Sequence, residues 1–430
     1  MKTNIKQAWQ TIFEQCKVIE AVKRNGHFDI TADKIKAIGG KEPRLMAKWD
    51  SSFSVPEVFS QNGLGLIATS RGGYRIGTFN IFHKIETDRL NAAQIQSRQV
   101  PSWMLSLGKE LRERSEPGLL SACYASGIMR EYANAESTDI FPGIFGRLTT
   151  DKFNFTLGAV NGRRETISCD GTQFEIDASY ESPEALLIVE AKNVLLEDFN
   201  LRQLYFPWRY LREKTNKTIR PLFIMRSNEV ISVCEYAFGK VDEMDSLTLV
   251  SAKRYSFADT EITTQDLRDA LASFRRQKKA CNLIFPQADR MELVIDLCER
   301  LRNSPADADG IADDLNYVHR QGQYYGRAAH FLGLVEKTKA SYRLTAEGER
   351  IFNLPYKQRQ LAIAKQFLQY RVFANCLKSL LEHSVMPDTD TVAKWIVEDK
   401  WPMSGTTPKR RASTVIGWTR WLVNLTKENL

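Results

Sequence analysis

The pattern of apolar and polar positions divides the chain into a strand-rich first part and a helix-rich last part. Short apolar runs bounded by turn residues predict strands, at 64–70, 74–81, 153–159, 166–169, 174–180, 186–192, 221–226, 230–238 and 246–254. Apolar positions spaced three and four apart predict helices, within 1–36, at 118–134, 197–213, 291–301, 310–315, 321–334, 346–352 and 359–383. We therefore expect an α/β (α+β) fold with a mixed sheet, followed by a mostly helical C-terminal domain.

One predicted strand pair carries charged residues at apolar positions. The run 174–180 alternates and places Asp177 near its far end, and Asp170-Gly171 just before it favours a hairpin. After a turn at 181–184, the run 186–192 (LLIVEAK) is interrupted only by Glu190 and Lys192. Residues two apart share one face of a strand, so these two side chains point the same way.

These side chains have a chemical use together. Asp177 and Glu190 offer hard oxygen ligands to Mg²⁺, and Lys192 can orient an attacking water and offset charge on a phosphate. The alternative is an ordinary ion pair between an acid and a lysine at the rim of the sheet.

An aspartate, a short gap and Glu-x-Lys on a buried strand resemble the active site of the PD-(D/E)xK nuclease superfamily, with Ile176 in place of the family's proline. The predicted order of helix, meander, helix and strand is also that of the superfamily's core. The resemblance implies catalysis by Asp177, Glu190 and Lys192, with the Ala191 carbonyl as a further metal ligand. It also implies a position near the metal for Gln203, whose alternative role is packing and capping. For Glu131 it implies an additional acid, and the alternative is a solvated position on the helix surface.

The N-terminal region contains a basic loop at 41–52 and a predicted hairpin around Gly72-Gly73. EPRLMAKWD and SRGGYRIG resemble the part that precedes the nuclease core in some bacterial restriction enzymes. Cations of this region can hold DNA phosphates, or they form a solvated surface; they are Lys41, Arg44, Lys48, Arg71 and Arg75.

The C-terminal region has helices followed by two β-like pieces, 335–337 and 341–344, which is the winged-helix order. The run YYGRAAHFLGLVEKTKASYRLTAEGERI closely resembles winged-helix domains fused to restriction endonucleases, and PKRRASTVIGWTRWLVNL resembles their tail. The helix at 321–334 would then enter the major groove, with His330 packed inside. Base contacts are expected from Gln321, Gln323, Tyr324 and Arg327, and phosphate contacts from Lys337, Lys339, Lys409, Arg410 and Arg411. A winged helix used for protein contacts is the alternative.

Composition narrows the choice of function. The formal net charge of +8 favours a polyanionic partner, and most of the excess lies C-terminal to residue 263. No apolar run predicts a membrane span or a signal peptide, so a cytoplasmic protein is expected. The seven cysteines form no CxxC pair and the five histidines are isolated, so no zinc site is indicated. There is no Walker A loop, which argues against an ATP-driven motor.

We expect three regions: an N-terminal α/β region that contacts DNA (1–100), a nuclease core (101–262) and a winged-helix domain with a helical tail (263–430). The resemblance implies a type II restriction enzyme: a Mg²⁺-dependent, sequence-specific endonuclease of double-stranded DNA, with Mn²⁺ as a substitute cofactor. Products would carry 5′-phosphate and 3′-hydroxyl ends. Partners would be a second copy of the chain, as a homodimer, and a cognate DNA methyltransferase. A modification-dependent or repair nuclease and a non-catalytic winged-helix DNA-binding regulator remain open.

Overall fold

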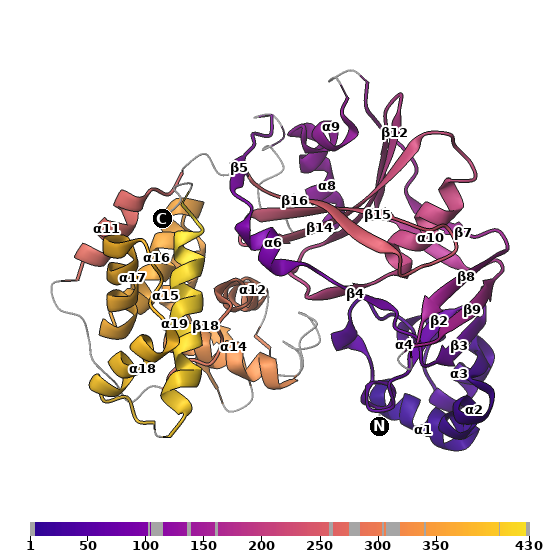
Figure 1. Cartoon of the computed structure of the whole chain (residues 1–430), viewed down its shortest axis with the longest axis horizontal. Coiled ribbons are helices and arrows are strands. Elements are labelled where there is room, and N and C mark those ends of the chain that lie inside the picture. The colour runs from indigo at the N-terminus through magenta and orange to yellow at the C-terminus, as the bar shows by residue number, and fades with distance from the viewer. Residues whose placement is uncertain are drawn as a thin grey trace. The chain divides into compact units, whose positions relative to one another are not determined.

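The computed structural model describes residues 5–101, 104, 115–135, 139–159, 162–257, 261–274, 284–302, 305–306, 319–338, 341–403 and 405–426. The chain forms two compact units. The first comprises 1–87, 100–225 and 233–252, and the second comprises 88–99, 226–232 and 253–430. Figure 1 shows a mixed α/β arrangement for the N-terminal half and a mostly helical C-terminal region. Among the described residues, no helix is long and apolar enough to cross a membrane.

The N-terminal part of the first unit packs short helices against a three-stranded sheet of order β1-β3-β2. Its elements are α1 (Ile5–Cys16), α2 (Val18–Asn25), β1 (His27–Thr31), α3 (Ala32–Gly39), α4 (Pro43–Met46), η1 (Ser52–Ser54), α5 (Glu57–Ser60), β2 (Gly65–Ala68) and β3 (Gly73–Gly77). Trp9, Trp49 and Phe59 are buried and meet edge to face, with Phe59 4.8 Å from Trp9 and 4.6 Å from Trp49 between ring centroids. This aromatic core holds the 41–52 segment on the helices.

A seven-stranded mixed sheet has the order β5-β16-β15-β14-β12-β11-β6. Its strands are β5 (Ile95–Ser97), β6 (Phe141–Pro142), β11 (Ala178–Glu181), β12 (Ala185–Lys192), β14 (Thr218–Ser227), β15 (Val230–Phe238) and β16 (Leu247–Ser256). The strand β12 pairs antiparallel with β11 and parallel with β14. The chain reaches β14 through α10 (Arg202–Leu211), as a parallel pair requires a crossover. Helices α8 (Glu116–Ala125) and α9 (Ile128–Ala133) precede the sheet's β6.

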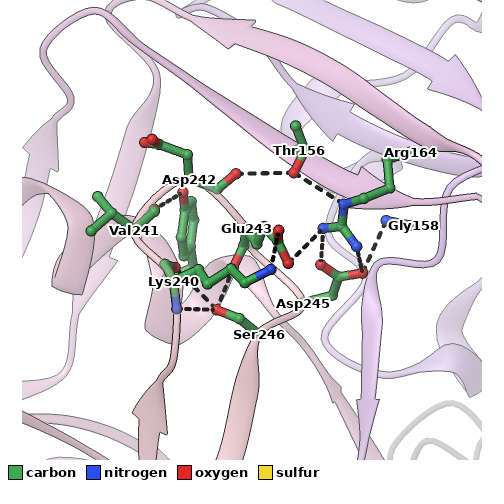
Figure 2. A network of polar contacts seen from close by, with 10 residues as sticks. Thr156, Gly158, Arg164, Lys240, Val241, Asp242, Glu243, Asp245 and Ser246 are labelled. Atoms are coloured by element: carbon green, nitrogen blue, oxygen red, sulfur yellow. Dashed lines mark hydrogen bonds and ion pairs between the residues drawn. The ribbon is translucent and has the colours of Figure 1, made fainter.

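Smaller strand pairs surround this sheet: β8 (Phe153–Gly158) with β9 (Arg164–Cys169), β7 (Gly146–Thr149) with β10 (Gln173–Ile176), and β4 (Phe82–Lys84) with β13 (Asp198–Asn200). The turn between β15 and β16 is fastened to the β8–β9 hairpin, as Figure 2 shows. Arg164 forms ion pairs with Asp245 and Glu243, and the Asp245 carboxylate also accepts a 3.0 Å bond from Gly158 N–H. These contacts hold the hairpin against the turn.

The second unit is mostly helical, and a small hairpin lies among its described residues. Its elements include α6 (Thr87–Ala92), α11 (Thr264–Ala272), α12 (Met291–Leu301), α14 (His319–Phe331), β17 (Val335–Lys337), β18 (Tyr342–Leu344), α15 (Ala346–Phe352), α16 (Tyr356–Leu368), α17 (Arg371–His383), α18 (Thr389–Glu398) and α19 (Thr407–Val423). The strands β17 and β18 are antiparallel. Helix α14 lies close to this hairpin, since a Cβ added at Gly326 would meet the Tyr342 ring at 2.6 Å.

Most predicted strands are confirmed within a few residues, but the segment that carries Asp177 differs from expectation. The predicted single strand 174–180 is two strands, β10 and β11, which pair in different sheets on either side of Asp177. The Asp170-Gly171 turn exists, with Gly171 at φ +66°, yet it does not join paired strands. Instead β9 pairs with β8, and β10 with β7. The predicted hairpin was wrong because turn residues show where the chain reverses, not which strand it then joins.

Helix boundaries needed similar corrections. The predicted helix 118–134 is split at Gly127, whose φ of +82° ends α8. The predicted helix 197–213 begins only at Arg202, since 198–200 pairs with β4. The predicted helix 359–383 is α16 and α17, and the loop expected at 137–150 contains β6 and β7. The strand β1 was not predicted, and the helix expected at 310–315 lies outside the described residues.

Candidate active site

The sheet brings Asp177, Glu190, Lys192 and Gln203 together within the first unit. The Asp177 carboxylate accepts a 2.9 Å hydrogen bond from Ala191 N–H, across the β11–β12 pair. Glu190 Oε1 accepts 2.6 Å bonds from both Lys192 Nζ and Gln203 Nε2. The predicted set is therefore one connected cluster: Glu190 and Lys192 lie on β12, Asp177 lies just before β11, and Gln203 lies on α10.

Local sequence explains this placement. The strand β12 is buried along its length until half-buried Lys192, because it lies between β11 and β14. Glu190 is thus a buried acid, 7% exposed, in an otherwise apolar run. Such a group requires partners, and Gln203 in the first turn of α10 supplies one of them.

Two further acids belong to the cluster, and neither was predicted. Asp50 Oδ2 lies 3.9 Å from Lys192 Nζ and 3.9 Å from Lys48 Nζ. Glu116, in the first turn of α8, raises the pKa of Lys192 together with Glu190 and Asp50. Glu116 at the start of α8 therefore acts on the cluster. The acid expected from the sequence, Glu131, lies on the next helix, α9. Asp50 ends the EPRLMAKWD motif, which was the available signal for it.

The electrostatics of the cluster show an excess of acid. Burial raises the pKa of the Glu190 carboxyl to about 7, and Asp177 and Asp50 add to the rise against the pull of Lys192. Burial also raises the pKa values of Asp177 and Glu116. Burial disfavours the Lys192 ammonium, but Glu190, Asp50 and Glu116 outweigh it and raise its pKa. Lys192 and the exposed Lys48 beside Asp50 cannot balance four carboxylates, so a bound cation would relieve their repulsion.

The donor set fits a hard divalent cation. Carboxylate oxygens are the ligands that Mg²⁺ prefers, and Asp177, Glu190 and the Ala191 carbonyl would hold it. Gln203 Oε1 is buried without a hydrogen-bond partner, which leaves one more oxygen to satisfy beside Glu190. Among the described residues, no three His, Cys, Asp or Glu side chains form a ready-made metal cluster. A cation here would therefore need the backbone or solvent as well.

The N-terminal cations expected at phosphates differ in their availability. Arg75 makes a bidentate bond to Asp29, at 2.7 and 2.8 Å, directly across the β1–β3 pair. Arg44 Nη2 lies 3.5 Å from the Glu175 carboxylate, and Lys48 Nζ lies 3.9 Å from the Asp50 carboxylate. Arg71 is exposed and Lys41 half-buried. Weak exposed pairs exchange readily for a phosphate, so Arg44 and Lys48 are more available than Arg75.

In the second unit, the predicted reading face of α14 points outward. Arg327 is exposed and Gln323 and Tyr324 are half-buried, while Ala328 and Ala329 are buried on the opposite face. His330 is exposed, so its predicted packing was wrong; helical spacing places it on the outer face beside Arg327. Gln321 lies within α14, but its side chain is not among those described, and Lys339 lies outside the described residues.

The remaining predicted cations lie on the wing and on α19. Lys337 is exposed, with Nζ 5.7 Å from the Tyr342 ring centroid. Lys409 pairs with Asp390 at 2.8 Å. Burial lowers the pKa of the Arg411 guanidinium, and Arg410 and Tyr324 also act on it. Arg411 near the start of α19 therefore interacts with Tyr324 on α14.

Three family models match the chain, and each is described only as a domain of unknown function: DUF6996 over residues 6–76, DUF6997 over 77–256 and DUF7226 over 293–427. The cluster around Glu190 draws Asp50 from the first of these and its other members from the second. No curated protein and no solved structure matches the chain.

Proposed function

We propose that this protein is a Mg²⁺-dependent, sequence-specific endonuclease of double-stranded DNA, of the type II restriction kind. The observation that carries the proposal is the cluster in which buried Glu190 binds Lys192 and Gln203 beside half-buried Asp177, with more carboxylates than cations. An acid-rich site that retains one lysine suits phosphodiester hydrolysis, which needs a cation, an oriented water and charge compensation.

The residues would divide this work between them. Asp177 and Glu190 would hold the cation, with the Ala191 carbonyl as a further donor, and the Ala191 N–H fixes the Asp177 carboxylate. Gln203 holds Glu190 in place, and Lys192 orients the water that attacks phosphorus in line. When bound, Mg²⁺ supplies positive charge against the charge that develops on the phosphate and leaving oxygen. We expect 5′-phosphate and 3′-hydroxyl ends.

Topology supports a PD-(D/E)xK-like core. Helices α8 and α9 precede the neighbouring sheet strands β6, β11 and β12, with β7 to β10 inserted between β6 and β11. After β13, the helix α10 leads to β14, which is parallel to β12. Apart from the inserted strands, this is the order of elements that the resemblance implies. The acids lie where β11 begins and β12 ends, which is where that core would require them.

The second unit supports a duplex as the substrate. Helix α14 presents Arg327 outward and is followed by the β17–β18 hairpin with exposed Lys337, an arrangement consistent with a winged helix. Arg411 interacts electrostatically with Tyr324 of the same helix. Cations around a helix with exposed hydrogen-bonding groups suit phosphate positioning and major-groove reading.

The test is digestion of mapped phage DNA by the purified full-length chain with Mg²⁺, Mn²⁺ or EDTA, followed by sequencing of the ends. Discrete fragments with one recurring sequence at the ends and no products in EDTA are expected. Cleavage of methylated DNA alone would instead identify a modification-dependent nuclease. Site-specific binding without cleavage in either metal would identify a regulator. A restriction role further requires that DNA treated with the cognate methyltransferase resist cleavage.

A further inference from the structure

We propose that Asp50 is a positioning residue for Lys192, which makes the segment 46–52 part of the active site. This inference rests on the proposed nuclease function and adds to it a residue from the N-terminal region. Asp50 acts through the Lys192 ammonium, 3.9 Å from its Oδ2.

The segment is anchored on one side to the aromatic core of the N-terminal helices. Trp9 Nε1 and Trp49 Nε1 both donate to the Met46 carbonyl, at 3.1 and 3.0 Å. Both indoles are buried, together with Met46. Since two buried donors share one carbonyl, the backbone leading to Asp50 has little freedom.

On its other side, the segment is bonded to β13, which follows the site strand β12 closely in sequence. Asn200 N–H donates to the Asp50 carbonyl at 3.0 Å, and Asn200 Nδ2 donates to the Trp49 carbonyl at 3.0 Å. Ser52 N–H donates to Asp198 Oδ1 at 2.7 Å. The backbone at Asp50 is therefore held against β13, which follows Lys192 by a few residues in sequence. These backbone contacts keep the Asp50 carboxylate near the Lys192 ammonium.

The chemistry of Lys192 explains why a second carboxylate is useful. Its closest partner, Glu190, already shares the same oxygen with Gln203 and is proposed to hold the cation. A carboxylate that gives its oxygen to a cation attracts an ammonium less strongly, because both partners are positive. When Glu190 holds the cation, Asp50 keeps the Lys192 ammonium oriented toward the reacting phosphate. Asp50 has a second cationic neighbour, Lys48. Because the Lys48 side chain is largely exposed, it does not prevent the Asp50 carboxylate from turning toward Lys192.

The kinetic test compares Asp50→Asn and Asp50→Glu with the wild type on a single-site duplex. Asp50→Asn should lower kcat about 10- to 100-fold, as losses of residues that orient a ligand do, with the duplex Kd unchanged. Asp50→Glu should restore most of the rate. Asp245→Asn is the matched control, since it removes a similarly exposed, ion-paired carboxylate that contacts Arg164 instead. Wild-type kcat in Asp50→Asn would overturn the inference.

A second measurement needs neither metal nor cleavage. Thermal unfolding of wild type, Asp50→Asn, Lys192→Met and the double variant in EDTA forms a double-mutant cycle. Asp50→Asn should lower Tm more, or raise it less, when Lys192 is present, with a coupling of about 1–3 °C. Additive changes in Tm would overturn the inference even if the enzyme cleaves DNA. A coupled pair in a chain that cleaves no DNA would instead count against the proposed nuclease function.

Discussion

At the scale of single residues, Glu190 and Lys192 should be indispensable for cleavage but not for folding. Glu190→Ala or Lys192→Ala should reduce cleavage at least several hundred-fold, or about 4 kcal/mol of transition-state stabilisation. Binding to the duplex should persist, because these groups act on the cation and water. Cleavage rates, with gel-shift affinity and Tm as controls, check this. Wild-type-like cleavage by either folded variant would refute the catalytic assignment.

A second residue-scale prediction concerns pH and the N-terminal sheet. The bond from Arg75 holds the pKa of the Asp29 carboxyl below its ordinary value of 3.8, against the effect of burial. A depressed folded-state pKa stabilises the fold above the unfolded-state pKa, and this stability is lost as pH falls through the folded-state value. Asp29→Asn should therefore destabilise the protein at pH 7 by about 1 kcal/mol or less, since Asp29 is half exposed. The difference from wild type should shrink as pH falls below about 4 and vanish once the pH is below the lowered folded-state pKa. Urea denaturation at several pH values measures it, and a pH-independent difference would contradict the assignment.

At the scale of elements, the packing of α15 on the β17–β18 hairpin depends on a glycine. A Cβ at Gly348 would lie 2.1 Å from the Leu334 carbonyl oxygen, so backbone would have to move. Gly348→Ala should destabilise the C-terminal unit by about 1–3 kcal/mol. The control is Gly72→Ala, where the nearest atom to an added Cβ is 3.9 Å away. Thermal unfolding compares them, and equal effects would show that this contact is not limiting.

The outer face of α14 and the wing should show different binding defects. Arg327→Ala should cost about 1–3 kcal/mol on the preferred site and reduce discrimination, because guanidinium groups read guanine. Lys337→Ala should weaken binding equally on all sequences and reduce the salt slope by about one phosphate contact. Titrations of cognate and scrambled duplexes at several salt concentrations separate the two effects. Identical defects in both variants would argue that α14 does not read bases.

At the scale of the whole molecule, cutting both strands with one catalytic cluster per chain is simplest for two subunits related by a two-fold axis. We expect a homodimer on DNA and a palindromic site. Sedimentation of the catalytically inactive Lys192→Ala variant on a cognate duplex measures the stoichiometry. One chain per duplex, with both strands cut by wild type in a single encounter, would exclude the dimer.

Local features of the fold could be predicted from the sequence, because period and turn chemistry depend on neighbouring residues. The strands β12, β14 and β15 and the helix α12 follow their apolar patterns closely. The spacing in Glu-x-Lys likewise placed Glu190 and Lys192 on one face of β12. The bonds that connect them to Gln203 and bring Asp177 to Ala191 agree with the expected grouping.

Tertiary structure alone decided the long-range relations, and the reason is physical. No local pattern specifies that β10 pairs with β7, since several strands offer the same backbone hydrogen-bonding groups. Asp50 and Glu116 reach the cluster across long stretches of chain, through the Trp49 core and the start of α8. Their sequence neighbourhoods, a basic loop and a helix start, do not indicate which residues they approach. Asp50 and Glu116 approach Lys192 because apolar residues elsewhere in the chain pack together. The sequence shows which residues are apolar, but it does not show where in space they pack.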